Sequence, residues 1–340
     1  MKKVVTFGEI MLRLQPPSYQ RILQAGRFDA VYGGGEANVA VSLAQFGLRA
    51  AFVTRLPVNP LGLAARNELR KWGVDTSHIA FGGDRLGIYF CEKGASQRPS
   101  NVVYDRAGSA ISTAAEQDFD WDAIFADADW FHFTGITPAL GDRVAAITAA
   151  ACRAAKKRGI TVSCDLNYRK KLWSREKAGT VMGELCEYVD VLIANEEDSA
   201  DVFGIRAAES DIEGGRLSAE GYTDVARQLT DRFGFQYVAV TLRESLSASV
   251  NNWSGMLYSG GQAQFSPKYE IHIVDRVGGG DSFGAGLIYA LLDGMEAERA
   301  IRFAVAASCL KHTVEGDFNV TSVAEVEALL KNGGSGRVQR

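Results

Sequence analysis

A regular alternation of short apolar runs with longer segments of helical period constrains the fold of this chain most. The runs are rich in β-branched and aromatic residues and cover 3–7, 50–54, 129–133, 160–164, 189–194 and 237–241. Between them, amphipathic segments cover 36–46, 63–72 and 143–158, each followed directly by a glycine. Strands that alternate with helices need crossover connections. The pattern therefore predicts an α/β fold, a mainly parallel sheet with helices on both faces.

Two segments, at about 13–33 and 86–110, break this alternation. The first is polar, and the second contains two alternating runs joined by a turn rich in glycine, serine and proline, which is typical of a β-hairpin. We expect them to form a small antiparallel β-sheet that stands off the core as a lid. The two-residue period places Tyr104 and Arg106 on the same face of that hairpin.

Composition restricts the class of protein. The 340 residues are 46% hydrophobic and 23% charged, which suits one large globular domain over 1–330, and the Gly-rich polar tail 331–340 is expected to be flexible. The net charge is −4 and basic residues form no stripe, so nucleic acid is not an expected partner. No apolar stretch approaches the roughly 18 residues that cross a membrane. The 5 cysteines lack CxxC spacing and predict free thiols in a reducing cytoplasm.

Polar side chains follow three successive predicted strands. Asp165 and Asn167 follow the first, Asn195 and Asp198 the second, and Arg243 the third. Ligands of open α/β sheets bind beyond the carboxyl ends of the strands. Any one of these clusters is ordinary loop polarity, but three at one edge favour a binding site.

The stretch "DRVGGGDSFGAG" (275–286) is the most unusual local feature. It lacks the lysine of a phosphate-binding Walker loop and the glycine spacing of a dinucleotide-binding loop. Asp281 as a simple helix cap, worth about 1 kcal/mol, would leave the three preceding glycines unexplained. We therefore interpret Gly278, Gly279 and Gly280 as an anion hole for a transferring phosphoryl group and Asp281 as the base that accepts a hydroxyl proton. The helix N-terminus is expected to lower the pKa of Asp281.

These residues resemble the ribokinase-like, or PfkB, carbohydrate kinases. "DRVGGGDSFGAG" is similar to the carboxy-terminal signature of that family, and "YGGGEANVA" (32–40) is similar to its amino-terminal signature. The resemblance covers residues 3 to about 330. It is strongest to the branch that acts on 2-keto-3-deoxygluconate, through the segments 86–90, 102–110, 133–140, 163–169 and 311–318.

The resemblance implies ATP-dependent phosphorylation of a six-carbon keto-acid at its terminal hydroxyl, with ATP and Mg²⁺ as cofactors and a monovalent cation as a third candidate. It also implies pairing of subunits through the lid. Asp281 then corresponds to the base and Asn195 with Asp198 to the metal motif. The positions matching substrate contacts are Gly34, Tyr89, Tyr104, Arg106, Ile136, Arg169 and Asp317, and those near the nucleotide phosphates are Asp165, Asn167 and Arg243.

The chain departs from the family pattern at two places. Asp198 stands where the metal motif has a glutamate, and the nucleotide-side loop 241–249 contains no glycine. Two alternatives remain open, a kinase of a neutral hexose such as fructose and a sugar-binding sensor without catalysis. Arg106 and Arg169 argue against a neutral sugar, which offers a guanidinium no charge partner.

Overall fold

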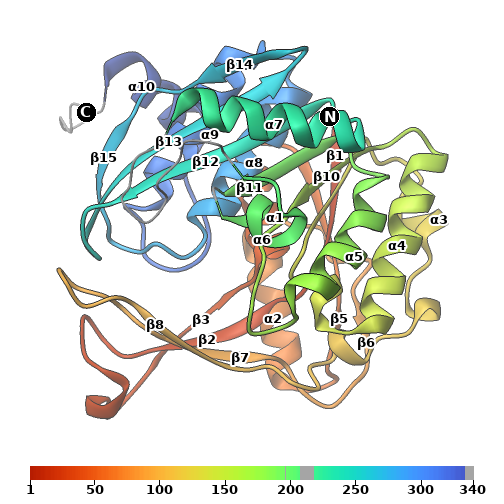
Figure 1. The fold of residues 1–340 in the computed structure, drawn as a ribbon. Helices are drawn as coiled ribbons and strands as arrows, with labels where there is room; N and C mark the ends of the chain where they lie inside the picture. Colours follow the sequence, from red (N-terminus) through yellow and green to blue (C-terminus); the bar gives the residue numbers. More distant parts are fainter. Residues whose placement is uncertain (196, 207–217, 334–340) are drawn as a thin grey trace.

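The computed structural model describes residues 1–195, 197–206 and 218–333, and a mixed β-sheet forms the centre of this part of the chain (Figure 1). The sheet has 9 strands in the order β14-β13-β12-β11-β10-β9-β1-β4, and β15 pairs with β13. The strands are β1 (Lys3–Phe7), β4 (Arg49–Val53), β9 (Trp130–Thr134), β10 (Thr161–Asp165), β11 (Val191–Asn195), β12 (Tyr237–Ser245), β13 (Val250–Ser259), β14 (Gln262–Phe265) and β15 (Tyr269–His272).

The strands from β12 to β4 pair in parallel, whereas β13 runs antiparallel to β12 and adds an antiparallel edge. All six apolar runs of the sequence overlap a strand of the parallel part. These strands are buried almost throughout, which explains why they are apolar on both faces rather than alternating. The predicted fold class is confirmed.

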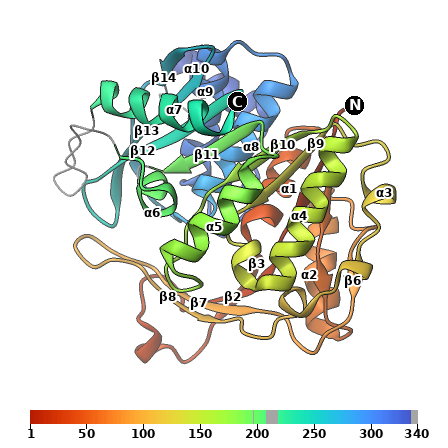
Figure 2. The ribbon, with the colours of Figure 1, turned by 45° about the vertical axis from the view of Figure 1, so that its right-hand side comes forward.

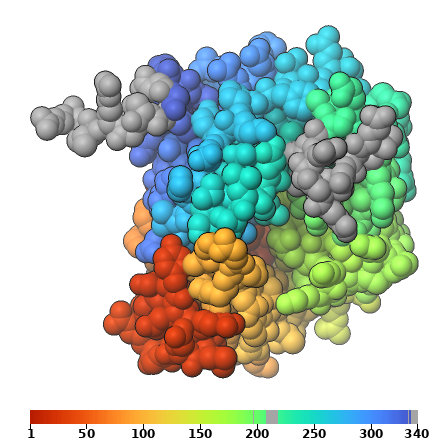
Figure 3. Space-filling view, turned by 60° about the vertical axis from the view of Figure 1, so that its left-hand side comes forward, coloured from red at the N-terminus to blue at the C-terminus, as the bar shows by residue number. Residues whose placement is uncertain are grey.

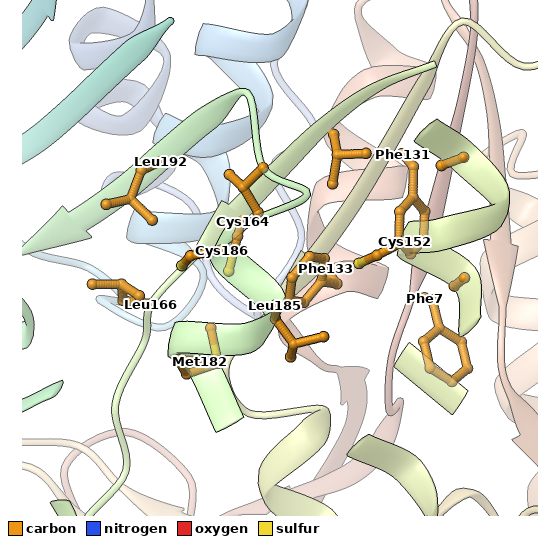
Figure 4. Packing of buried hydrophobic residues seen from close by; sticks show 14 of the residues in the cluster. Phe7, Phe131, Phe133, Cys152, Cys164, Leu166, Met182, Leu185, Cys186 and Leu192 are labelled. Carbon is orange, nitrogen blue, oxygen red and sulfur yellow. The ribbon is translucent and has the colours of Figure 1, made fainter. Parts of the chain in front are cut away.

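Helices cover both faces of the sheet (Figure 2). On one face, α4, α5 and α7 pack on a cluster that includes Phe131, Phe133 and Cys164, and Figure 4 shows part of it. On the other face, α1, α2, α8, α9 and α10 bury the opposite side chains of the same strands. The helices are α1 (Gly35–Gln45), α2 (Pro60–Lys71), α3 (Trp121–Ile124), α4 (Asp142–Lys157), α5 (Arg175–Cys186), α6 (Asp198–Phe203), α7 (Ala219–Phe233), α8 (Gly279–Leu292), α9 (Ala297–Lys311) and α10 (Val323–Asn332).

The glycines that follow the predicted helices end them as expected. Gly47 and Gly159 adopt left-handed backbone conformations with φ of 84° and 68°, just past α1 and α4. A side chain at such a φ would be strained, so glycine is the natural terminator. At the other end of the chain, α10 continues to Asn332, and residues 334–340 of the predicted tail lie outside the described residues.

The lid is a separate sheet in the order β3-β2-β7-β8. Its strands are β2 (Met11–Gln15), β3 (Asp29–Gly33), β7 (Ile88–Glu92) and β8 (Asn101–Asp105). The hairpin β7–β8 is confirmed, but the expectation of a purely antiparallel sheet is wrong, because β2 and β7 pair in parallel. Each of the hairpins β2–β3 and β7–β8 runs out from the core and returns, so their outgoing strands point the same way. Shorter elements are β5 (Arg55–Leu56), β6 (Ala80–Phe81), η1 (Ile22–Gln24), η2 (Ile111–Thr113), η3 (Glu116–Asp118) and η4 (Pro138–Leu140).

The tip of the β7–β8 hairpin touches the turn between β12 and β13 (Figure 3). The Ser96 amide donates to Ser249 Oγ at 3.0 Å, and the Ala248 amide donates to the Ser96 carbonyl at 2.7 Å. The lid therefore bridges two segments that are far apart in the sequence, and it encloses the carboxyl edge of the parallel strands.

Two other expectations from composition concern cysteines and membrane helices. All five cysteines are free, and four of them are buried. No helix among the described residues has the length and apolar character to span a membrane.

The same glycine-to-alanine change is expected to have opposite effects in two helices. In α8, a Cβ at Gly286 would lie 2.9 Å from Ala304 Cα and 3.2 Å from Ala307 Cβ, so Gly286→Ala should destabilise the fold by about 1–3 kcal/mol. In α5, Gly183 has open space around its Cβ position, so Gly183→Ala should stabilise by about 0.5–1 kcal/mol. Urea unfolding of both variants measures this. Equal effects at both positions would show that close packing of α8 on α9 is not what requires glycine.

Candidate active site

The polar clusters that follow three strands lie together at one edge of the sheet. Strands β10, β11 and β12 are neighbours, with Asp165 in register with Ile193 and Asn195 in register with Thr241. The edge on which sequence reasoning placed a site is therefore formed by Asp165, Asn195 and the residues that follow Thr241. The clustering predicted for these strand ends is confirmed.

Two acidic side chains lie close together at this edge, and Arg169 is the basic side chain whose charge acts on both. Burial, together with the charges of Asp198 and Asp281, holds the pKa of Asp165 well above its ordinary value. Burial raises the pKa of Asp198 to about 6, although its oxygens accept amide hydrogen bonds from Tyr168 and Asn195. Within the described ranges, neither carboxylate has an ion-pair partner.

A hydrated divalent cation fits this pair better than a directly caged one. Asn195 Oδ1 accepts from the amides of Glu197 and Asp198, so its oxygen is already used. No group of three His, Cys, Asp or Glu side chains that could cage a metal occurs in the part of the chain that the structure describes. Mg²⁺ commonly uses one or two carboxylates, waters and substrate phosphates. Asp165 and Asp198 suit that mode.

The glycine loop opens α8, and packing explains two of its three glycines. Gly278 is the N-cap, with φ of 83°, and a Cβ there would lie 2.0 Å from the Asp317 carbonyl oxygen. A Cβ at Gly279 would lie 2.4 Å from the His312 ring. At Gly280, which is exposed, the Cβ position is open. The amides of Gly280 and Asp281 meet no acceptor among the described residues, so they are available to an anion at the start of α8.

Asp281 is not the helix cap, because α8 begins at Gly279 and Asp281 lies inside its first turn. Its Oδ2 accepts a 2.6 Å hydrogen bond from Asn38 Nδ2. Burial raises the pKa of Asp281 to about 6, and the Asp317 charge adds to this, while Asn38, Arg169 and Lys311 oppose it. The expectation that the helix N-terminus would lower the pKa is therefore wrong, since desolvation outweighs the helix dipole. A carboxyl group with a pKa near neutrality is suited to accept a proton.

Asn38 links the two glycine signatures, and sequence reasoning did not single it out. It lies on α1, is buried, and accepts from the Gly34 amide at 3.2 Å while donating to Asp281. Gly34 packs against the segment between β1 and β2, since a Cβ there would lie 1.9 Å from the Glu9 carbonyl oxygen. The N-termini of α1 and α8 thus meet at Asp281. The signal in the sequence was the asparagine within "GGGEANVA" (33–40), because an asparagine side chain that is buried needs hydrogen-bond partners.

Tyr89 and Asp317, two predicted substrate contacts, bind each other. The Tyr89 hydroxyl donates to Asp317 Oδ2, and Arg13 Nη1 donates to Asp317 Oδ1 at 2.7 Å. Arg13 Nη2 also binds Asp275 at 2.8 Å, and all three charged groups are buried. Asp317 is therefore part of a buried ionic cluster under the lid.

The two arginines proposed for a substrate carboxylate differ in their partners. Arg106 Nη2 forms an ion pair with the buried Glu9, and its guanidinium lies over the Tyr104 ring at 5.5 Å. Arg169 is exposed, and among the described residues its side chain makes one hydrogen bond, a 3.4 Å contact from Nη1 to the Tyr168 carbonyl. It has no ion pair in the ranges described. Arg169 is thus the freer cation.

Ile136 and Asn167 lie at the ends of the neighbouring strands β9 and β10. The Ile136 amide donates to Thr134 Oγ1 at 3.2 Å, directly after β9. Asn167 has a positive φ of 39°, a conformation uncommon for a residue other than glycine, two positions after β10 ends. Both are partly exposed at the edge where Asp281 lies.

A cavity of about 400 Å³ lies between the lid tip and the turn that follows β12 (245–248), with Arg276 in its wall. Arg276 Nη2 donates to the Ala248 carbonyl at 3.1 Å, and burial and the Arg243 charge lower its pKa. Two guanidinium groups so close together favour an anionic ligand such as a polyphosphate. Sequence reasoning named Arg243 but missed Arg276, which stands inside the glycine signature itself.

Comparisons with known proteins agree with this geometry. The family model "pfkB family carbohydrate kinase" matches residues 1–322. The 2-dehydro-3-deoxygalactonokinase of Haloferax volcanii is 37% identical over 335 residues, 98% of each chain. The crystal structure of 2-dehydro-3-deoxygluconokinase from Thermotoga maritima has a TM-score of 0.94 and 57% identity and covers 97% of this chain and 98% of that one. A putative ribokinase II of E. coli, at 20% identity and a TM-score of 0.82, covers 97% and 99% and confirms the ribokinase-like fold.

Asp317→Asn should cost stability, because it leaves the buried Arg13 charge with one partner fewer. Breaking a buried ion pair typically costs about 3–5 kcal/mol, so a loss in this range is expected in urea unfolding. Asp122→Asn, which removes the exposed partner of Arg158, is the matched control and should change stability little. Equal stability of the two variants would contradict a structural role for Asp317.

Proposed function

This chain belongs to the pfkB family of carbohydrate kinases, and we propose that it phosphorylates 2-keto-3-deoxygluconate at its terminal hydroxyl with ATP. The family membership makes it a phosphotransferase that acts on an alcohol group. The choice of a keto-deoxy sugar acid is supported by the names of its relatives, of which the gluconate kinase is the more similar at 57% identity.

The observation that carries the choice of an acid is the exposed guanidinium of Arg169, which forms no ion pair within the described ranges. Its charge lies close enough to Asp281 to oppose the rise in the pKa of that carboxyl group. A guanidinium matches a carboxylate with two parallel hydrogen bonds, and charge-assisted bonds contribute about 1.5–3 kcal/mol each. In the proposal, Arg169 binds the substrate carboxylate, and Arg106 helps from the lid with Glu9 holding its side chain. Gly34, Tyr89, Tyr104, Ile136 and Asp317 then surround the sugar.

Asp281 acts as the base in this proposal. The terminal hydroxyl oxygen attacks the γ-phosphorus of ATP, a new P–O bond forms, the bond to the ADP oxygen breaks, and the hydroxyl proton passes to Asp281. The Asn38 hydrogen bond fixes the carboxylate at 2.6 Å, which leaves its other oxygen for the substrate. Positioning matters more than basicity here, because the transition state of phosphoryl transfer is loose.

The amides at the start of α8 and the arginines on the nucleotide side stabilise charge on the transferring group. Gly278, Gly279 and Gly280 form the anion hole, with the free amide of Gly280 nearest the open side. Arg243 and Arg276 supply the positive charge for the ATP phosphates. Asp165 and Asn167 complete this side of the site. The glycine-free turn 245–248 holds the nucleotide through its own backbone and the lid tip.

Magnesium would be held by the ATP phosphates and, through water, by Asp198, with Asn195 positioning Asp198 by accepting a hydrogen bond from its amide. When bound, it neutralises phosphate charge. The repulsion of Asp198 on Asp165, which raises the pKa of Asp165 despite the nearby Arg169 charge, supports this assignment, since a cation would relieve it.

We also propose a cytoplasmic location and pairing of subunits through the lid. Five free cysteines suit a reducing compartment. On the lid, the side chains of Val103 and Tyr104 on β8 are 48% and 43% exposed, which supports contact with a second copy.

Asp281→Asn should lower kcat by several orders of magnitude with little change in either KM, because the carboxylate acts in the transition state. In the unchanged protein, kcat/KM should fall as the pH drops below about 6, since a protonated Asp281 cannot accept a proton. Steady-state kinetics from pH 5 to 8 measure both effects. Asp293→Asn, at the exposed far end of α8, is the control and should behave like the parent. Near-normal turnover of Asp281→Asn would overturn the assignment of the base.

Arg169→Ala should reduce kcat/KM for the keto-acid about ten- to a hundred-fold and leave the low activity toward fructose almost unchanged. A neutral hexose has no carboxylate for the guanidinium. The ratio of kcat/KM for 2-keto-3-deoxygluconate to that for fructose is the measurement, and Lys170→Ala, which removes the next exposed cation, is the control. Equal losses toward both sugars would favour a neutral-sugar kinase in which Arg169 serves the fold or the nucleotide.

A further inference from the structure

The last residue of α9, Lys311, is fully buried behind the glycine loop. Its Nζ donates to the carbonyl oxygens of Gly316 at 2.6 Å, Val314 at 3.2 Å and Asp275 at 3.3 Å. The turn from 312 to 316 wraps around the ammonium group and brings two of these carbonyls to it. Three backbone oxygens from two separate segments thus converge on one nitrogen.

The hydrogen-bond pattern matches the charged form of this lysine. A neutral amine has two N–H groups, whereas an ammonium has three, one for each carbonyl. Burial lowers the pKa of Lys311, and the Arg13 charge adds to this. The carboxylates of Asp275 and Asp317 oppose the shift and favour the ammonium form. The cluster therefore holds two cations and two anions, and it balances without any dissolved ion.

The ammonium lies directly against the loop that forms the anion hole. A Cβ at Gly278 would lie 3.3 Å from Lys311 Cε and 2.0 Å from the Asp317 carbonyl. Asp275, whose carbonyl binds Nζ, precedes Gly278 by three residues, and its carboxylate accepts from the Gly316 amide at 3.2 Å. The path of residues 275–278 is thus fixed by Lys311 on one side and Arg13 on the other.

A cage of backbone carbonyls is the chemistry that binds inorganic monovalent cations, because such oxygens replace the hydration shell of the ion. A dissolved potassium ion does not fit here, since Nζ takes the position to which the oxygens point. We propose that the Lys311 ammonium is a built-in monovalent cation, which positions the anion-hole loop and makes the enzyme independent of dissolved potassium or ammonium. Lys311 is a positioning residue and does not touch the substrate.

This inference rests on the kinase activity of the family and not on the identity of the sugar. The parent protein is assayed, with its melting temperature measured, in tetramethylammonium chloride and then with added KCl or NH₄Cl at constant ionic strength. We expect activity and melting temperature to be the same in all three salts. A potassium-dependent rise of either quantity in the parent protein would overturn the proposal.

The variant Lys311→Ala opens the cage to a dissolved ion. In tetramethylammonium chloride its kcat should fall at least ten-fold, and NH₄⁺ or K⁺ should restore much of it with saturation while raising its melting temperature. Lys311→Met, whose side chain refills the space without charge, should lose kcat without such rescue. Lys157→Ala, at the exposed last residue of α4, is the matched control and should show neither effect.

Two outcomes with the variants would also overturn the proposal. One is full activity of Lys311→Ala without any added cation, which would show that the loop does not need the charge. The other is a folded Lys311→Ala whose loss of kcat responds to no cation, which would make Lys311 a packing element only. The salt comparison on the parent protein decides the question if Lys311→Ala fails to fold.

Discussion

The buried guanidinium of Arg13 is the contact on which the geometry of the site depends. Arg13 belongs to β2 of the lid, yet it binds Asp275 and Asp317, which belong to the core on either side of the glycine loop. Burying any one of these charges alone would cost several kcal/mol of folding free energy, about as for other unpaired buried ions, whereas together they form ion pairs. The lid strand is therefore anchored at its root to the same residues that shape the start of α8. The position of the lid and the path of the glycine loop 278–280 are set by one set of charges.

This arrangement explains why the loop needs glycine where it does. The Asp317 main chain lies against Gly278, and the Asp317 side chain leaves no room for a Cβ at Gly33. Close approach of backbone segments is what lets Arg13 and Lys311 reach their acceptors. Apolar residues of similar volume can replace many buried ion pairs without loss of stability. They could not aim carbonyls and carboxylates at fixed points, so the ionic cluster contributes geometry more than stability.

The sequence predicted those features that depend on local pattern. The hydrophobic period and the glycines that end helices located the strands, the helices and the lid hairpin. The polar residues that follow β10, β11 and β12 located the edge of the candidate site. It did not predict features that depend on long-range packing. Lys311 at the end of a helix looks like an ordinary surface lysine that interacts with the helix dipole. The parallel pairing of β2 with β7 and the pairing of Arg106 with Glu9 depend on segments more than 70 residues apart.

The prediction that the pKa of Asp281 is lowered was wrong for the same reason, because desolvation depends on long-range packing. From the sequence, only the helix N-terminus is visible, and it should stabilise the carboxylate. The burial that raises the pKa depends on segments far away in the sequence, such as α1, where a Cβ at Gly35 would lie 3.6 Å from Asp281 Oδ1. In the proposed function, this burial has a consequence for the chemistry. The Asp317 charge adds to the rise in the pKa of Asp281, and the charges of Arg169 and Lys311 oppose it, so desolvation remains the largest cause. A carboxylate whose pKa is raised in this way can accept the hydroxyl proton near neutral pH, and the hydrogen bond from Asn38 holds it in place while it does so.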